Sequence, residues 1–345
     1  IFARAMTPDY RAIPSSFEVE GDSVWTHCGD RGDAAMYLYG CSRYLLARGD
    51  RALAAELWPA LEWCAEYCRR RTNAVGVVES DTDELEGRFP TGKANLSTSC
   101  LAYGGYRAAA AVAQGLGKGE VSAALSARAD ALEGAIEDHF GADVEGFATY
   151  RYFEGCTVLR SWICLPLTMG LRQRQRGTVD ALFSPRLWTA DGLATQAGEQ
   201  TFWDRATLYG LRGVLAAGDT ERAMGCLSAL SRRRLLGDHV PYMVEAWPEG
   251  GQAHLSAESA LYCRVFTEGL FGITPSGFDA FACRPQLPTS WPRMALRGLA
   301  AFGKTFDLEI ERSGADQMRV STTVTGGTRE TREAGIGETV DISFG

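Results

Sequence analysis

The spacing of apolar residues constrains the fold of this chain more than any other feature of its sequence. Apolar residues recur at intervals of three and four through one segment after another, which is typical of amphipathic helices. In the segment 51–71, for example, Leu53, Leu57, Leu61 and Cys64 share one helical face. The spacing predicts helices over the following ranges: 33–48, 51–71, 97–115, 120–140, 158–171, 178–183, 203–217, 219–236 and 255–271. The chain is therefore predicted to be mainly α-helical.

The connections between the predicted helices alternate between short turns, such as "RGD" and "AGD", and long loops. The long loops cover the ranges 10–32, 72–96, 141–157, 184–202 and 237–254. If the helices run up and down, the long loops meet at one end, and long loops in compact domains are usually functional. This pattern predicts an antiparallel helical toroid with a functional site among its long loops. A helical solenoid is the alternative, but the sequence shows no repeat of fixed period.

The sequence pattern changes after "TPSG". The stretches "KTFDLEIERSG", "QMRVSTTVTG" and "ETVDISFG" alternate apolar and polar residues between glycines, which indicates antiparallel strands. We therefore predict a helical domain over residues 1–278 and a small antiparallel β-domain over residues 279–345.

The net charge and the lengths of the apolar runs limit the kinds of partner that we expect this chain to bind. The net charge of −8 argues against nucleic acid, because binding to polyanions depends on clustered Lys and Arg. Arginines do cluster at 172–176 and 232–234, but we interpret both clusters as solvated helix ends, where cations suit the helix dipole. No apolar run is long enough to predict a membrane partner, and the oligomeric state stays open.

The ten cysteines and four histidines lack the spacing of a zinc site, so we expect no metal or other cofactor. Several cysteines lie in apolar helical stretches, among them Cys164 and Cys263. Buried free thiols in a reducing compartment explain this usage, which favours a cytoplasmic location.

An acidic stretch, "VVESDTDELEGRFPTGK", occupies residues 77–93. It carries five carboxylates within eight residues: Glu79, Asp81, Asp83, Glu84 and Glu86. Residues 87–93 match the phosphate-loop pattern GxxxxGK. However, Ala94 stands where that pattern has a hydroxyl residue, and no good strand precedes the segment. Asp81 and Asp83 match the D-x-D start of a calcium loop, but the Gly and Glu that follow are not at EF-hand spacing. A solvated acidic loop and a catalytic acid both remain open.

The catalytic interpretation needs a second carboxylate beside aromatic residues. The last long loop supplies one in "PYMVEAWPEGGQAHLSAESALY", which contains Glu245 and Glu249 with Trp247 and His254. Glycoside hydrolysis uses one carboxylic acid to protonate the leaving oxygen and one carboxylate to activate water or attack the sugar.

These stretches resemble a known group of enzymes. "VESDTDELEGRF" resembles the general-acid loop of glycoside hydrolase family 63, whose pattern is roughly E-S-G-x-D-x-x-x-R-F. "VEAWPEGG" and the following "LSAESALYCRVFTEGLFGITPSG" resemble the closing segment of the six-hairpin glycosidases, which include rhamnosidase family 78. "LWTADGLATQAGEQTFWDRATLYGLRGVL" and "RPQLPTSWPRMALRGL" are similar to these enzymes too, so the resemblance spans residues 25–310. It implies an (α/α)6 toroid followed by a β-domain.

If the range 255–271 is the twelfth barrel helix, the acidic stretch lies between helices five and six, and Glu245 between eleven and twelve. The resembled enzymes carry their acid and base at these places. The same count implies that the first three helices are largely absent. Either residues 1–32 take their place, or an upstream segment is missing.

The resemblance implies catalytic roles. Asp83 matches the acid position best, and Glu84 and Asp81 follow because the loop is one residue longer than the pattern. Crowded carboxylates would raise the pKa of this acid as its role requires. Glu245 is implied to be the general base of an inverting enzyme, with Glu249 as the second candidate. A salt-bridged loop acid is the structural alternative for Glu245.

Tryptophans on or beside the long loops are candidates for stacking on sugar, whereas Trp58, Trp63 and Trp162 are predicted core residues. The candidate substrate-binding residues are Trp25, Arg31, Asp33, Asp81, Arg88, Trp188, Trp203, Trp247, Glu249 and His254. An N-cap role is the alternative for Asp33. Arg88 is a candidate partner for one of the clustered acids, and His254 has a structural role as its alternative.

The leading hypothesis is an inverting, exo-acting glycoside hydrolase that cleaves a terminal α-linked sugar from an oligosaccharide or glycoside. A glycoside phosphorylase on the same barrel and a catalytically inactive carbohydrate-binding domain are the alternatives.

Overall fold

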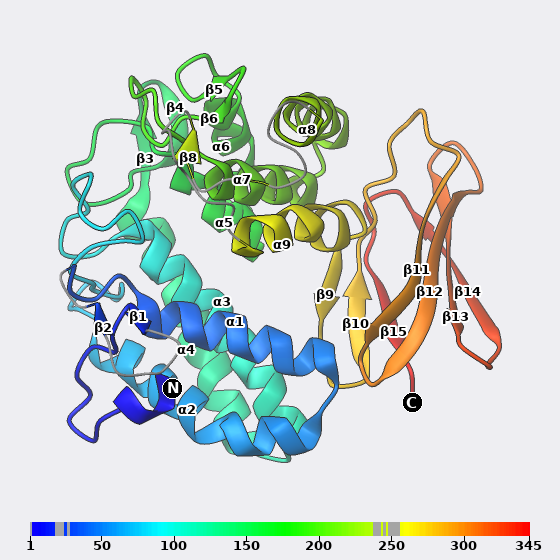
Figure 1. Cartoon of the computed structure of the whole chain (residues 1–345), viewed down its shortest axis with the longest axis horizontal. Helices are drawn as coiled ribbons and strands as arrows, with labels where there is room; N and C mark the ends of the chain where they lie inside the picture. The colour runs from blue at the N-terminus through cyan, green and yellow to red at the C-terminus, as the bar shows by residue number, and fades with distance from the viewer. Residues whose placement is uncertain (1, 18–23, 26–27, 237–242, 244–245, 248–255) are drawn as a thin grey trace. The chain divides into compact units, whose positions relative to one another are not determined.

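The structure is a computed structural model, and it describes residues 2–17, 24–25, 28–236, 243, 246–247 and 256–345 (Figure 1). The chain divides into two compact units, Ile1–Thr157 and Val158–Gly345. Within the described ranges, no helix is both long and apolar enough to cross a bilayer.

The first unit is built from two helical hairpins. They comprise α1 (Asp33–Arg48), α2 (Arg51–Arg70), α3 (Leu96–Gly115) and α4 (Gly119–Phe140). A short helix η1 (Phe2–Ala5) and the strand pairs β1 (Ser16–Phe17) with β2 (Val24–Trp25) and β3 (Gly141–Val144) with β4 (Phe147–Tyr150) complete the unit. The helices therefore form where the apolar spacing predicted them.

Helix α3 forms the centre of the first unit and packs chiefly against α1 and α4. Its residues from Leu96 to Tyr106 are all buried, because small side chains let the neighbouring helices approach. A Cβ atom added at Gly105 would lie only 3.0 Å from Cγ of Leu38 in α1. Asn95 caps the helix, since its side-chain oxygen accepts a hydrogen bond from the backbone N–H of Thr98.

The helices of the second unit surround α7 (Asp204–Ala217). They are η2 (Ser161–Ile163), α5 (Cys164–Met169), α6 (Gln175–Leu182), α8 (Thr220–Leu235), α9 (Ser256–Arg264) and the π-helix η3 (Val265–Leu270). Helix α7 contacts α5, α8, α9 and η3. Two short strand pairs accompany this helix. β5 (Trp188–Thr189) pairs with β6 (Gly192–Leu193), and both precede α7 in sequence. β7 (Phe202–Trp203), which ends directly before α7, pairs with β8 (Ala246–Trp247), which follows α8.

The C-terminal part of the second unit is antiparallel, as the alternating pattern predicted. One sheet has the order β11 (Arg293–Ala301), β12 (Lys304–Arg312), β13 (Gln317–Val324) and β14 (Arg329–Gly335). The other has the order β15 (Val340–Ser343), β10 (Ala280–Cys283) and β9 (Ile273–Pro275). Phe281 stacks on Phe302 and Phe306 with ring centroids 4.9 and 5.7 Å away, so aromatic packing fills the core here.

The interpretation of the arginine clusters as solvated helix ends is wrong in two respects. Arg174 is the N-cap of α6, and Arg176 lies in its first turn, so this cluster occupies the end that cations do not suit. Arg234, in the last turn of α8, is buried, and its Nε donates to Oδ1 of Asp204 at 3.1 Å. Tertiary ion pairing, which apolar spacing does not reveal, fixes this residue.

All ten cysteines are free thiols. Burial raises the pKa of the Cys64, Cys68 and Cys283 thiols, to about 12 at Cys283, so these three stay protonated and pack as small apolar groups. The expectation of burial is wrong for Cys263, which is exposed on α9.

The close backbone packing at the junction between η3 and β9 can be tested by substitution of Gly272. Gly272 has a φ of 65°, and an added Cβ would overlap the backbone of Arg284. We expect Gly272→Ala to lower the free energy of unfolding in urea by about 2–5 kcal/mol, through strain at positive φ plus the clash. Gly298→Ala is the matched control, because Gly298 has a φ of 62° but open space around it. It should cost only about 1–2 kcal/mol, and equal losses in the two variants would contradict the clash.

Candidate functional site

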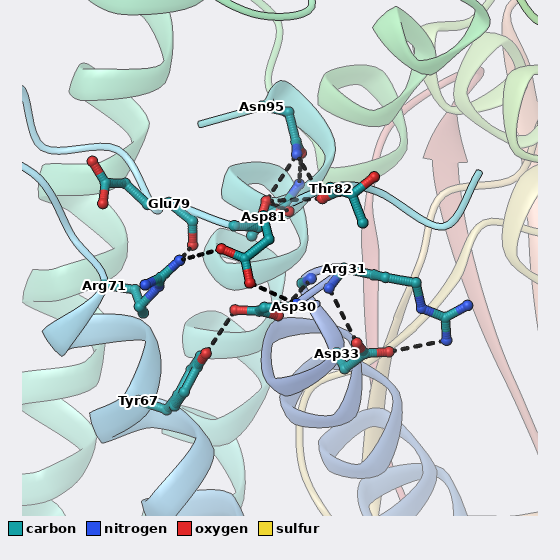
Figure 2. Close-up of polar contacts among 12 residues, drawn as sticks. Asp30, Arg31, Asp33, Tyr67, Arg71, Glu79, Asp81, Thr82 and Asn95 are labelled. Atoms are coloured by element: carbon teal, nitrogen blue, oxygen red, sulfur yellow. Dashed lines mark hydrogen bonds and ion pairs between the residues drawn. The ribbon is translucent and has the colours of Figure 1, made fainter. Parts of the chain in front are cut away.

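The acidic stretch lies between α2 and α3 and is fastened to the start of α1 (Figure 2). The backbone N–H groups of Asp81 and Thr82 both donate to the carbonyl oxygen of Asp30, at 2.8 and 3.0 Å. In return, the N–H of Asp30 donates to Oδ2 of Asp81 at 2.9 Å. These three bonds hold residues that are 51 or more positions apart in sequence, so the stretch is an anchored loop.

Asp30 is the buried centre of this anchor, with 3% of its surface exposed. Its carboxylate accepts hydrogen bonds from the Tyr67 hydroxyl at 2.7 Å and from the N–H of Gly32 at 2.8 Å. Burial raises the pKa of Asp30, and the two hydrogen bonds oppose this shift without cancelling it. The carboxyl is therefore held by donors from α2 and from its own turn.

Two glycines make the close approach of these segments possible. Gly29 and Gly32 have φ angles of 67° and 84°, in the region that other residues rarely adopt. A Cβ at Gly29 would lie 2.6 Å from Oδ2 of Asp81, and one at Gly32 would lie 2.6 Å from Oγ1 of Thr98. The sequence "GDRGD" thus allows one turn to meet both the acidic stretch and α3.

Arg31 and Asp33, the predicted sugar-binding pair, contact each other. The Arg31 guanidinium donates to Oδ1 of Asp33 at 3.2 Å, to Oε1 of Glu86 at 2.8 Å and to the carbonyl of Ser15 at 3.0 Å. Helix α1 begins at Asp33 with Gly32 as its N-cap. The alternative of an N-cap role for Asp33 is therefore wrong.

Asp83 is enclosed, with 1% of its surface exposed. Its Oδ2 accepts a hydrogen bond from the Tyr152 hydroxyl at 2.7 Å, and its Oδ1 accepts one from the N–H of Leu85 at 2.9 Å. Asn95 ties the same loop to α3, because its Nδ2 donates to the carbonyl of Thr82 at 3.1 Å. These three bonds fix the loop around the predicted acid.

The other acids of the stretch lie nearer to solvent. Glu84 is half-buried, whereas Asp81 is exposed and lies 3.5 Å from the Arg71 guanidinium. Arg88 is exposed. The structure shows Arg31 as a partner of Glu86, a contact that sequence spacing did not reveal.

The phosphate-loop alternative lacks the strand that it requires, because Val78 forms only an isolated antiparallel bridge with Thr72. Among the residues with described positions, no three His, Cys, Asp or Glu side chains gather closely enough to hold a metal ion.

In the second unit, the predicted aromatic residues lie on short strands. Trp203 is buried in β7, and Trp188 in β5 packs against Phe183 with ring centroids 5.1 Å apart. β7 pairs with β8, so Trp203 is opposite Ala246. Trp25 and Trp247 have described backbones in β2 and β8 but no described side chains, and Glu245, Glu249 and His254 lie outside the described residues.

Sequence reasoning missed a charged group beside Trp203. Nε of Arg205 donates to Oε1 of Glu258 at 2.8 Å, and its guanidinium lies 5.0 Å from the Trp203 ring centroid. Glu258, in the first turn of α9, is fully buried. The acid is visible in "LSAES" at the start of the predicted helix 255–271, but the sequence shows neither its burial nor its partner, which is 53 positions away. Asp30 and Tyr152 were missed for the same reason.

The comparisons with known proteins agree on fold. No protein-family description and no curated protein matches the sequence. Among solved structures, a sialidase superposes with a TM-score of 0.68 at 14% identity, over 91% of this chain and 34% of its own. The GH78 family rhamnosidase of Bacillus sp. GL1 superposes with a TM-score of 0.56 at 16% identity, over 84% of this chain and 31% of its own.

A rhamnosidase from Klebsiella oxytoca, solved with rhamnose bound, has a TM-score of 0.57 and 17% identity, over 77% of this chain. The fold is that of the six-hairpin glycosidases. The resemblance inferred from short motifs is thereby confirmed at the level of fold, as is the mainly α architecture with a small β-domain. The chain covers 34% of the sialidase, 31% of the Bacillus rhamnosidase and 52% of the Klebsiella rhamnosidase. It therefore spans about a third to a half of the length of these solved proteins.

The Asp30 anchor generates a pH-dependent prediction. Because its folded pKa is raised above 3.8, the stability that Asp30 contributes is greatest at low pH and is lost as pH rises through the raised value. Tyr67 counters this loss by bonding the charged form. Tyr67→Phe should therefore cost about 1 kcal/mol in acid and roughly 1.5–3 kcal/mol at neutral pH, measured by urea unfolding across this range.

Tyr106→Phe is the matched control for Tyr67→Phe. The Tyr106 hydroxyl is also buried, but it donates to the uncharged carbonyl of Ala65 at 3.2 Å. Its loss should cost about 1 kcal/mol at every pH below neutrality. Parallel pH profiles for the two variants would show that Asp30 does not titrate in the folded state as proposed.

Proposed function

We propose that this chain is a glycoside hydrolase that acts with inversion on a terminal α-linked sugar of an oligosaccharide or glycoside. The observation that carries the proposal is the fold similarity to a sialidase and two rhamnosidases, which extends over 77–91% of the chain. Because fold alone does not fix activity, the roles of individual residues are argued from the site.

The acid of the reaction comes from the acidic stretch, and Glu245 is the base that activates water. An inverting enzyme needs both carboxyl groups, separated by about 6.5–9.5 Å so that a water fits between them. The anchoring of the stretch by Asp30, Asn95 and Tyr152 supports this role. A loop held by buried hydrogen bonds keeps a catalytic side chain in one position.

Of the three candidates for the acid, Asp81 belongs to the anchor, because its Oδ2 accepts a hydrogen bond from the N–H of Asp30, which leaves Asp83 and Glu84. A proton donor must reach the leaving oxygen of the substrate. Asp83 accepts bonds at both carboxylate oxygens and is enclosed, which favours a role in ordering the loop. Glu84 is half-buried in the same loop. The two acids therefore have to be separated by experiment.

The structure supports the candidate sugar-binding residues to different extents. Trp188 is half-buried and presents an aromatic ring beside the 184–202 loop. Arg31 and Asp33 already satisfy one another, which favours a structural contribution from this pair. Trp25, Trp247, Glu249 and His254 are retained from the motif resemblance.

The leaving group of the substrate separates the catalytic roles. We expect the true acid variant, Asp83→Asn or Glu84→Gln, to lose about 10²–10⁴-fold in rate on 4-nitrophenyl α-glycosides. On 2,4-dinitrophenyl glycosides, whose leaving group needs no proton, most of that rate should return. Glu245→Gln should lose rate on both. The measurement is kcat/KM for each variant, with the anomer of the first product assigned by NMR.

Tyr152→Phe is the control for Asp83, because it removes the hydrogen bond to Oδ2 of Asp83 and keeps the carboxyl. If Asp83 only orders the loop, Asp83→Asn and Tyr152→Phe will lower stability and rate alike with either leaving group. A product of retained configuration would overturn inversion. Failure of the wild-type protein to hydrolyse any α-glycoside, the rhamnoside and sialoside included, would overturn the hydrolase assignment.

A further inference from the structure

A pocket lies between α2 and α4 in the first unit. Its volume is about 460 Å³, within the range of about 300–1,000 Å³ that is typical of small-molecule sites. Its lining includes Trp58, Glu62 and Ala65 of α2 and Leu125 and Arg128 of α4. The residues that line this α2–α4 pocket belong neither to the acidic stretch nor to the predicted sugar-binding set, so it is a separate feature of the first unit.

The floor of the α2–α4 pocket is apolar. Trp58, Ala65 and Leu125 line it and are buried. Helix α4 packs chiefly on α3, and α2 packs chiefly on α1. Where α2 and α4 line the pocket they carry small side chains, Ala65 and Ala124, which leave space between the helices. An apolar ligand would be drawn to this floor by the hydrophobic effect.

The aromatic residues in the described lining are not placed to stack on a sugar. Trp58 is buried. Tyr10 stacks on Trp63 with ring centroids 5.2 Å apart, and the Arg70 guanidinium lies 4.0 Å from the centroid of the Tyr10 ring. Two groups this close to one ring occupy its opposite faces. Because a sugar needs an open aromatic face for stacking, the pocket suits another class of ligand.

Two of the charged lining residues have a structural role. Glu66 accepts hydrogen bonds from Nε of Arg69 at 2.7 Å and from Nε of Arg70 at 2.9 Å, and these bonds lower the pKa of Glu66 to about 2. Glu120 lies in the first turn of α4, where an acid suits the helix dipole, two residues after Lys118. The charges of Glu66 and Glu120 are therefore explained within the protein.

The other two charged lining residues, Glu62 and Arg128, have opposite signs and come from different helices. Glu62 on α2 is exposed, and Arg128 on α4 is half-buried. Neither forms an ion pair with another described residue. Burial raises the pKa of the Tyr106 hydroxyl, Arg128 opposes this rise and Glu66 adds to it, so Arg128 lies near Glu66. Glu66 is one helical turn beyond Glu62, about 6 Å along α2.

We propose that the α2–α4 pocket binds a short apolar peptide with free termini, whose carboxylate pairs with Arg128 and whose ammonium pairs with Glu62. A guanidinium matches a carboxylate with two parallel hydrogen bonds. Two or three extended residues span about 7–11 Å, which is enough to join charges separated by a helical turn and the width of the pocket. The apolar side chains of the peptide cover Ala65 and Leu125. This inference does not rest on the proposed hydrolase function.

Calorimetry with dileucine and with its N-acetylated, amidated form tests the role of the charges. The wild-type protein should bind dileucine saturably and the capped form at least about tenfold more weakly. Arg128→Gln should weaken dileucine binding by about ten- to a hundredfold, because hydrogen bonds to a charged group are lost. Glu62→Gln alters an exposed acid and should weaken binding by about two- to fivefold. Glu56→Gln, at an exposed acid of α2 outside the lining, is the matched control and should leave the affinity unchanged.

A second pair of variants tests the place of binding. Ala124→Phe puts a ring into the pocket, whereas Ala123→Phe puts the same ring on the surface of α4 outside the lining. Both alanines are exposed, so both variants should fold. Dileucine binding should be lost in Ala124→Phe and kept in Ala123→Phe.

Each outcome decides the inference. A wild-type protein that does not bind dileucine overturns it. Equal binding of the capped peptide, unchanged by Arg128→Gln, would show an apolar pocket without recognition of the termini, which also overturns it. Displacement of dileucine by rhamnose would identify a carbohydrate site instead. Hydrolysis of α-glycosides should be the same in all these variants, so a failure of the hydrolase proposal is distinguishable from a failure of this inference.

Discussion

The buried carboxyl and carbonyl of Asp30 are the interaction on which the first unit depends most. The carbonyl accepts two N–H groups from the acidic stretch, and the carboxylate accepts the Tyr67 hydroxyl of α2. Replacing the Asp30 side chain would leave the Tyr67 hydroxyl and the Gly32 N–H without this acceptor, and burial makes each such loss costly, whereas the two bonds to the backbone carbonyl do not depend on the side chain. The turn, the acidic loop and two helices therefore form as one unit.

The second unit uses buried charge in a different way. Arg234 and Asp204 are both buried and pair with each other, which joins α8 to the first residue of α7. Such a pair is tolerated only when both partners are present, because either charge alone would be buried without compensation and would destabilise the fold. Glu258, in the first turn of α9, is likewise buried and accepts a hydrogen bond from Nε of Arg205 in α7.

Local signals in the chain predicted the elements well and their interactions poorly. Helix α3, predicted over 97–115, runs from Leu96 to Gly115, because spacing and an Asn cap act within a few residues. The strands from Lys304 onward formed for the same local reason. Asp83 was selected by a motif, but its burial against Tyr152, 69 positions away, depends on where α3 and the β3–β4 hairpin place that tyrosine. No pattern in either segment encodes that contact.

The sequence by itself determined the helical periodicity, the antiparallel strands and the concentration of acids between α2 and α3. It did so because apolar spacing, turn residues and motif order are local properties of the chain. Only the tertiary structure decided which acids are anchored and which are buried, as Asp30 and Asp83 show. Burial and hydrogen bonding are set by segments that meet in space, and charge in a protein acquires its energy and its chemistry from those neighbours.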